Sequence, residues 1–216
     1  MVIAENKFIW LHFGKTAGTT CRDGLLRLFP DAFCYPDNDP LKHGNLSTAR
    51  SGGLDIPEGV PVLLGVRRLE SWVDSHLREQ FFGGAPVDVR EQTIDGRLIL
   101  GEQSKAREIG LFEGVETLDD LIRYYCSDRE VIFIRNEYLA KDFTRFFKSR
   151  FPNMEKEEIR QAFHGRKNVK KNQGGSILTS EELTRLSAAC PLWKSLESKL
   201  YSRSIFRGYR QEPVKI

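Results

Sequence analysis

The feature that most constrains this chain is a short apolar segment that leads through a loop of small residues into a helical pattern. Phe8–Phe13 is almost continuously apolar and is bounded by Gly14, which is typical of a central strand covered on both faces. After the loop Gly14–Thr20, the apolar residues between Leu25 and Phe29 have the spacing of a helix that packs on a sheet. The sequence therefore predicts a strand, a small-residue loop and a helix in direct succession.

Two further strands of the same kind are expected. Val60–Val66 and Val131–Ile134 are short, buried-strand patterns, and Pro61 is expected at the beginning of the first. Helical spacing is found in residues 69–82, 117–125 and 139–151. This alternation predicts an α/β fold with three layers, in which helices flank a mainly parallel central sheet. Ligands of such sheets bind beyond the carboxyl ends of the strands.

The connecting segments are polar and rich in turn residues. Tyr35–Gly59 is expected to be a loop with one short helix around Leu46–Arg50, and Gly83–Glu102 an excursion over the active face. Thr179 or Ser180 can cap a last helix, because two glutamates fall in the first turn, where the helix dipole favours anions.

Length and charge narrow the possible functions. With 216 residues, 40% hydrophobic and 11% aromatic, the chain is expected to form one domain over residues 1–216. The chain has 33 Lys plus Arg and 30 Asp plus Glu. Its net charge of +3 is too small for a general nucleic-acid binder. The sequence contains no run of about 18 apolar residues, so a membrane span is not expected. The beginning of the chain lacks a signal-peptide pattern, and the four cysteines form no C-x-x-C pair, so a reducing cytoplasm is the expected location.

The loop Gly14–Thr20 has the chemistry of an anion cradle. A small-residue loop that opens a helix offers backbone N–H groups to an anion, and the helix dipole adds to the attraction. Lys15 brings a full positive charge, and three threonines add hydroxyl donors. The loop is not a Walker A motif, because its lysine precedes Ala17 and Gly18 instead of following the glycines. The other interpretation is a tight turn between strand and helix with a solvated lysine.

The residues of this loop also resemble a known motif. His12-Phe13-Gly14-Lys15-Thr16-Ala17-Gly18-Thr19-Thr20 resembles the 5′-phosphosulfate loop of the sulfotransferases, whose common form is H-[IV]-P-K-[TC]-[GA]-G-[TS]-[TS]. Gly14 stands where that form has proline. The residues that match are Lys15, Thr16, Gly18, Thr19 and Thr20.

A second motif of that family follows the second predicted strand. Arg67 and Ser75 stand eight residues apart, as in the family's 3′-phosphate motif. A guanidinium at the strand end and a hydroxyl two helical turns later could grip one phosphate between them. Arg68 and Leu69 stand where many relatives have Asp or Asn followed by Pro. Two roles are open for Arg68, a second phosphate ligand or a surface charge.

Two weaker elements follow. The stretch from Glu137 to Phe143 is similar to the family's E-x-L-x-x-D-F, in which the acid is mainly structural, so Glu137 is assigned a helix-start role. Gly165–Asn172 is basic and occupies the place where relatives carry a loop over the adenosine 3′-phosphate. Such a cluster alone is more often a solvated loop, but together with the other motifs it makes Arg166 and Lys170 candidate donor-binding residues.

The resemblance implies an activity and a donor. Sulfotransferases of this kind have a fold similar to the P-loop nucleotide kinases, and they transfer a sulfuryl group from 3′-phosphoadenosine 5′-phosphosulfate (PAPS) to a hydroxyl or amine, which releases adenosine 3′,5′-bisphosphate (PAP). No metal is expected at the donor site. The acceptor would be a small molecule or a glycan, of a class that the residues leave open, as they leave the oligomeric state.

The general base is the least determined role. A histidine with a pKa near neutrality is the usual group for deprotonating an alcohol. His43 lies between the two phosphate motifs, where several relatives place a catalytic histidine, and Glu79 and His76 are its rivals. His12, beside the loop, is expected to orient it, whereas His164 precedes the basic segment.

Two other functions compete with this hypothesis. An ATP-dependent kinase of related fold would require Mg²⁺ and a lysine late in the loop. A non-catalytic nucleotide-binding protein would keep the loop without a base, and this alternative would gain support if His43 lay far from Lys15.

Overall fold

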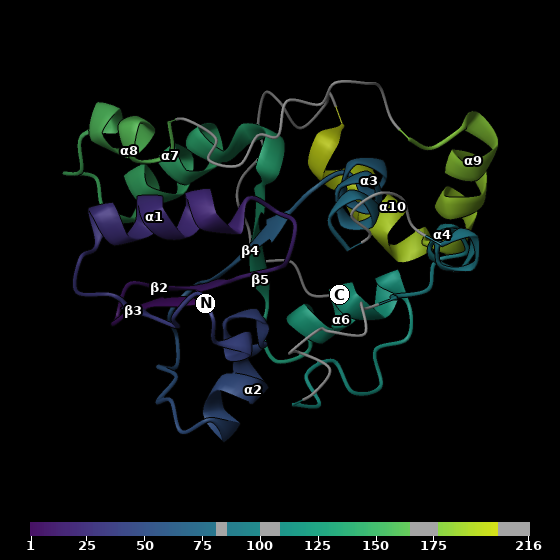
Figure 1. Cartoon of the computed structure of the whole chain (residues 1–216). Coiled ribbons are helices and arrows are strands. Elements are labelled where there is room, and N and C mark those ends of the chain that lie inside the picture. Colours follow the sequence, from purple (N-terminus) through teal and green to yellow (C-terminus); the bar gives the residue numbers. More distant parts are fainter. Residues whose placement is uncertain (81–85, 100–108, 165–176, 203–216) are drawn as a thin grey trace. The chain divides into compact units, whose positions relative to one another are not determined.

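The computed structural model describes residues 1–80, 86–99, 109–164 and 177–202 (Figure 1), with the side chains of Glu79 and Gln80 left aside. The chain forms two compact units. The first contains residues 1–66 and 128–164, and the second contains the described parts of 67–127 and 177–202. The expectation of a single domain over residues 1–216 stays a prediction.

The first unit is built on a five-stranded mixed sheet of strand order β3-β1-β2-β4-β5. The strands are β1 (Val2–Ala4), β2 (Phe8–Leu11), β3 (Phe33–Cys34), β4 (Val62–Val66) and β5 (Val131–Arg135). β2, β4 and β5 are parallel neighbours, with Trp10 paired to Leu63 and Leu63 to Ile132. Every residue of these three strands is buried, which explains their continuous apolar sequence.

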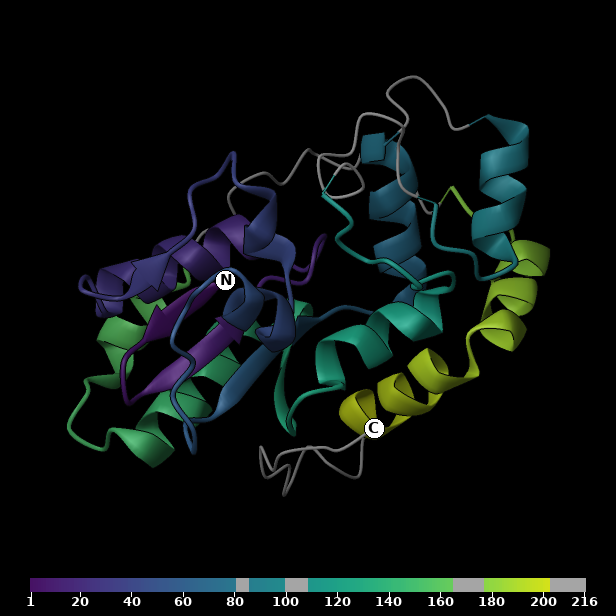
Figure 2. The same cartoon turned by 90° about the horizontal axis from the view of Figure 1, so that it is seen from below.

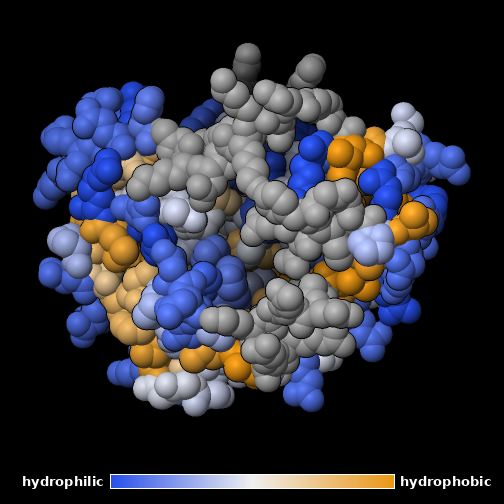
Figure 3. Space-filling model, viewed as in Figure 1, coloured by the Kyte–Doolittle hydropathy of each residue, from blue (hydrophilic) through white to orange (hydrophobic). Residues whose placement is uncertain are grey.

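Helices lie on both sides of this sheet. The helical segments of this unit are α1 (Gly18–Leu28), η1 (Pro40–His43), α2 (Leu46–Ser51), η2 (Asn136–Tyr138), α7 (Leu139–Arg150) and α8 (Lys156–Ala162). Figures 1 and 2 show α1, α7 and α8 on one side and α2 on the other. The outer side of α8 is hydrophilic (Figure 3), as expected for a helix that buries only Ile159 and Ala162.

The core of this unit is aromatic and lies between the sheet and α1, α7 and α8. Phe8 contacts Phe29, Phe146 and Phe147 edge to face, with ring centroids 5.0–6.4 Å apart. Phe143 stacks on Phe163 at 4.0 Å. Offset and edge-to-face contacts of this kind each stabilise the fold by about 0.5–1.5 kcal/mol beyond the effect of burying apolar area. The sheet from which the loop after β2 begins is therefore well packed on this side.

A buried ion pair fixes the segment after β5. The Arg135 guanidinium donates to both carboxylate oxygens of Asp142, at 2.8 and 2.6 Å, and the Arg135 backbone N–H donates to the same group at 3.0 Å. The Arg135 and Asp142 side chains are 3% and 0% exposed, so the pair needs this bidentate geometry to offset its desolvation. Glu137 lies in the first turn of η2, consistent with a helix-start role.

The second unit is helical in its described residues. It contains α3 (Leu69–Gln80), α4 (Val87–Ile94), α6 (Leu118–Cys126), α9 (Ser180–Ala189) and α10 (Pro191–Tyr201). Figures 1 and 2 show α4 beside α9, and Arg90 joins these helices through a bidentate pair with Glu182, both bonds 2.8 Å long. Asp119 of α6 accepts from the backbone N–H groups of Leu192 and Trp193, and it thereby caps the beginning of α10.

Most of the predicted elements are confirmed, with two corrections. The sheet is mixed, because β1 pairs antiparallel with β2 and β3; the expected parallel arrangement holds for β2, β4 and β5 only. Thr179 does cap a helix, with its side chain bonded to Glu182 N, but that helix is α9, and α10 follows it. The predicted excursion Gly83–Glu102 contains the helix α4, and the rest of it lies partly outside the described residues.

Candidate functional site

The loop between β2 and α1 has an unusual backbone. Lys15 has a φ of 66° and Ala17 a φ of 62°, so two residues with side chains occupy the left-handed region within three positions. This conformation costs roughly 1–2 kcal/mol for each such residue, and it persists only where the surroundings impose it. A turn of this kind directs consecutive N–H groups to one side and makes an anion-binding concavity. Ala17 is also the N-cap of α1 and has no side-chain cap, and the positive end of a helix dipole favours an anion at this position.

Thr16 anchors the loop to the sheet. Its hydroxyl donates to the backbone oxygen of Phe13 at 2.6 Å, and the residue is fully buried. A Cβ at Gly65 of β4 would lie 2.7 Å from the Thr16 hydroxyl oxygen, so the glycine makes room for the threonine. Because the hydroxyl hydrogen is directed to Phe13 and the side chain is buried, the Thr16 hydroxyl holds the loop in place and is not the ligand donor that the sequence analysis expects.

His12 occupies the space against the beginning of α1. A Cβ at Gly18 would lie 1.7 Å from Nε2 of His12, so only glycine permits this approach. The His12 ring also stacks on Trp10, with centroids 5.2 Å apart. The expectation that His12 orients the loop is consistent with this packing, since the first residue of α1 rests against its ring.

His43 lies beside the entrance of the loop. Its ring centroid is 4.4 Å from that of His12, and its Nδ1 is 3.2 Å from the His12 carbonyl oxygen. A Cβ at Gly14 would lie 4.0 Å from the same Nδ1. His43 ends η1, whose beginning is capped by the Asp39 carboxylate, and the following helix α2 is capped by Asn45. Two caps therefore fix the backbone on either side of the histidine.

The electrostatics of the site keep both histidines neutral near pH 7. Burial lowers the pKa of His43 to about 4. The hydrogen bond to the His12 carbonyl opposes this shift, and the positive charges of Lys42 and Lys15 add to it. Burial and the adjacent His43 lower the pKa of His12 well below its usual value. A pKa of about 4 is below the near-neutral value at which a histidine is most effective as a general base.

The tautomer of His43 follows from its hydrogen bond. A carbonyl oxygen is only an acceptor, so Nδ1 of a neutral His43 carries the hydrogen that it donates to His12. The lone pair then resides on Nε2. This is the arrangement that a general base requires, because the bonded nitrogen orients the ring and the other nitrogen accepts the proton.

The second predicted motif lies in the second unit. Arg67 directly follows β4, and its carbonyl oxygen accepts a hydrogen bond of 3.1 Å from the Trp193 indole. Ser75 is a half-buried residue of α3. Arg67 thus lies at the strand end and Ser75 on the following helix, as the sequence predicts.

The other histidines and the remaining candidate site residues differ in where they lie. His76 is 3% exposed, stacks on Trp72 with centroids 4.8 Å apart, and has Nε2 2.9 Å from the Ile99 carbonyl oxygen, which are the contacts of a packed core histidine. His164 is exposed. Arg166, Lys170 and the side chain of Glu79 lie outside the described residues.

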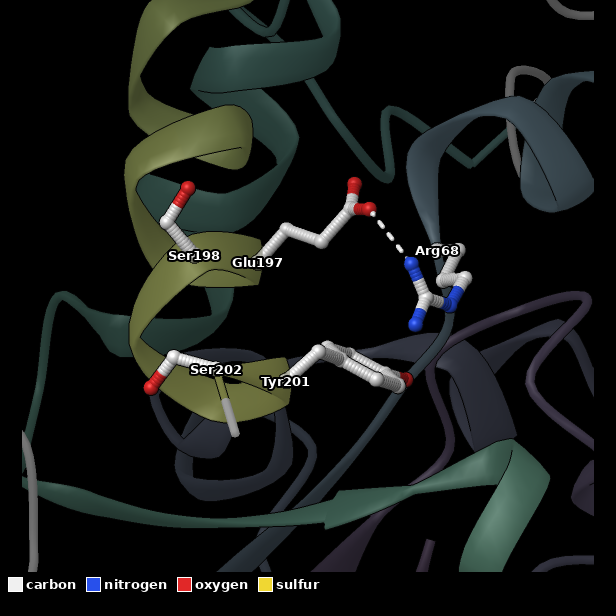
Figure 4. Close-up of a pocket in the computed structure, with 5 residues that line it drawn as sticks. All are labelled: Arg68, Glu197, Ser198, Tyr201 and Ser202. Carbon is white, nitrogen blue, oxygen red and sulfur yellow. Dashed lines mark hydrogen bonds and ion pairs between the residues drawn. The ribbon is translucent and has the colours of Figure 1, made fainter. Parts of the chain in front are cut away.

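Arg68 has a role that the sequence analysis did not anticipate. It forms an ion pair of 3.4 Å with Glu197 of α10, and its guanidinium carbon lies 4.5 Å from the centre of the Tyr201 ring. Figure 4 shows these side chains in a pocket that Ser198 and Ser202 also line. The local sequence around Arg68 holds no signal for this contact, because Glu197 is 129 residues away.

Comparisons with protein-family models, curated proteins and solved structures return no match to this chain. In the part of the chain that the structure describes, no helix is long and apolar enough to cross a membrane. Over the same residues, no three His, Cys, Asp or Glu side chains are grouped to hold a metal ion. The family resemblance therefore rests on the motifs themselves.

Proposed function

We propose that this protein is a sulfotransferase that takes a sulfuryl group from PAPS, on a fold related to that of the P-loop nucleotide kinases. The observation that carries the proposal is the strained loop Gly14–Thr20 at the beginning of α1, with the ring of His43 beside its entrance. A loop that holds two non-glycine residues in the left-handed region has a reason to do so if its N–H groups bind an anion.

The donor would be held by two groups of residues. The N–H groups of the loop and the ammonium of Lys15 would bind the 5′-phosphosulfate. Arg67 and Ser75 are assigned to the 3′-phosphate by their spacing in the sequence, and Arg166 and Lys170 are proposed to cover it. A guanidinium suits this task because its planar donors match a phosphate in a bidentate manner.

The reaction would proceed by in-line attack. The acceptor oxygen or nitrogen forms a bond to sulfur while the bond from sulfur to the bridging phosphate oxygen breaks, and PAP leaves. Nε2 of His43 takes the proton of the acceptor. The Lys15 ammonium stabilises the charge that develops on the bridging and equatorial oxygens. Positioning and electrostatics would supply most of the rate, as in phosphoryl transfer.

Calorimetric titration of the purified protein with PAP, and separately with ATP and Mg²⁺, tests the proposal. Micromolar binding of PAP without metal would support the donor site and justify a screen of hydroxyl and amine acceptors with PAPS. Selective binding of ATP with Mg²⁺ would contradict it and favour a kinase.

A further inference from the structure

Helix α10 contacts three consecutive residues, 67 to 69, which follow β4 and lead into α3. The Trp193 indole donates to the Arg67 carbonyl oxygen at 3.1 Å. One oxygen of Glu197 pairs with the Arg68 guanidinium at 3.4 Å, and the other accepts from the backbone N–H of Leu69 at 3.3 Å. Glu197 is 8% exposed. One late helix thus contacts Arg67, Arg68 and Leu69 in turn.

Glu197 supplies what the local sequence lacks. The Arg68 carbonyl accepts the first intrahelical bond of α3, from Trp72 N at 2.8 Å, so Arg68 is the N-cap residue. An arginine side chain has no acceptor and cannot cap a helix. The buried Glu197 carboxylate provides the acceptor from elsewhere in the chain, and its charge is favourable at the positive end of the helix.

The contacts also order the Arg68 side chain. Its guanidinium lies over the Tyr201 ring while one edge faces Glu197, and Figure 4 shows both partners extending from α10 toward Arg68. Arg68 is therefore held by two partners on α10, and the two roles that the sequence leaves open for it stay predictions.

We propose that Glu197 and Trp193 are positioning residues for Arg67, and that they set the direction in which the Arg67 side chain leaves the backbone. This inference rests on the proposed function, in which Arg67 binds the 3′-phosphate of the donor. A fixed backbone at residues 67–69 would spare the protein the cost of ordering Arg67 when the ligand binds. Glu197 would then affect the affinity for a 3′-phosphate and no other part of the ligand.

The test compares PAP with adenosine 5′-monophosphate (AMP), which lacks the 3′-phosphate, by calorimetry on the full chain. Glu197→Ala is expected to weaken PAP binding about tenfold, the order of one charge-assisted contact, and to leave AMP binding unchanged. In an Arg67→Ala background, Glu197→Ala should weaken PAP binding no further. Ser198→Ala is the matched control, because Ser198 is exposed on the same helix and points away from Arg68 in Figure 4.

A second, more conservative variant keeps the test valid if Glu197→Ala fails to fold. Glu197→Gln keeps an oxygen for Leu69 N, but it removes the charge that pairs with Arg68 and Lys194 and replaces the acceptor of Arg68 by an amide NH2. It should fold and show the same PAP-selective loss at smaller size. The inference is overturned if both Glu197 variants bind PAP normally while Arg67→Ala binds it weakly, or if PAP and AMP affinities fall by the same factor. If Arg67→Ala itself binds PAP normally, the phosphate assignment fails and this inference fails with it.

Discussion

Nδ1 of His43 lies 3.2 Å from the backbone oxygen of His12, and the two imidazole rings are 4.4 Å apart. This contact joins the segment before α2 to the end of β2, directly beside the loop Gly14–Thr20. It fixes the ring of the proposed base and the tautomer that it adopts.

Replacing His43 should affect chemistry more than donor binding. His43→Asn keeps a side-chain N–H for the His12 carbonyl and removes the proton acceptor. We expect kcat to fall by roughly 10²–10⁴-fold, the usual contribution of a general base, with the Kd for PAP unchanged. Steady-state kinetics and calorimetry measure the two quantities. His164→Asn, at an exposed histidine, is the control, and a loss that appears in Kd alone would reassign the base.

Removing the charge of Lys15 should abolish transfer while the fold persists. Lys15 has a φ of 66°, so Lys15→Gly removes the ammonium and also relieves the backbone, whereas Lys15→Ala removes the ammonium only. Both variants should be inactive with PAPS if the charge is what matters. Activity is measured as PAP release, with circular dichroism as the check on folding and the exposed Lys156→Ala as the charge control. Near-wild-type turnover in either variant would remove Lys15 from the mechanism.

The stability of the protein should fall in mild acid because of His43. Its pKa is about 4 in the folded protein, against a usual value of 6.5, so the unfolded chain binds more protons between these two values. The free energy of unfolding is therefore unaffected by His43 above about pH 6.5, and it decreases as the pH falls from 6.5 toward 4, because the unfolded chain takes up the proton first.

Urea unfolding between pH 4 and pH 7 measures this dependence. His43→Asn should show a shallower loss of stability over that range than the wild type, and His164→Asn should show the wild-type slope. Identical slopes in all three proteins would show that His43 does not titrate in this way.

The space at Gly18 gives a prediction on packing. Gly18→Ala would place a methyl group 1.7 Å from His12 Nε2, so the ring or α1 must move. We expect a loss of about 1–3 kcal/mol in the free energy of unfolding, as for overpacked cores, and weaker PAP binding because the loop is displaced. Gly52→Ala is the matched control, since its Cβ would have its nearest neighbour at 3.4 Å. An equal effect of both substitutions would argue against the His12 contact.

Local patterns in the sequence determined the main elements of the first unit. The continuous apolar runs of β2, β4 and β5 predict buried parallel strands, because both faces of such strands are covered. The small residues of the loop and the apolar spacing after it predict α1. β1 and β3 escaped prediction because strands of three and two residues carry too little periodicity to be recognised, and they make the sheet mixed.

The sequence by itself determined where the loop, Arg67 and His43 stand along the chain, because strand ends, glycines and motif spacing are local properties. Only the tertiary structure decided what surrounds them. His43 reaches His12 across 31 residues, and Glu197 reaches Leu69 across 128. Contacts of this range depend on how the sheet and helices pack, and no period or local propensity in the sequence encodes which distant carboxylate or carbonyl a side chain will meet.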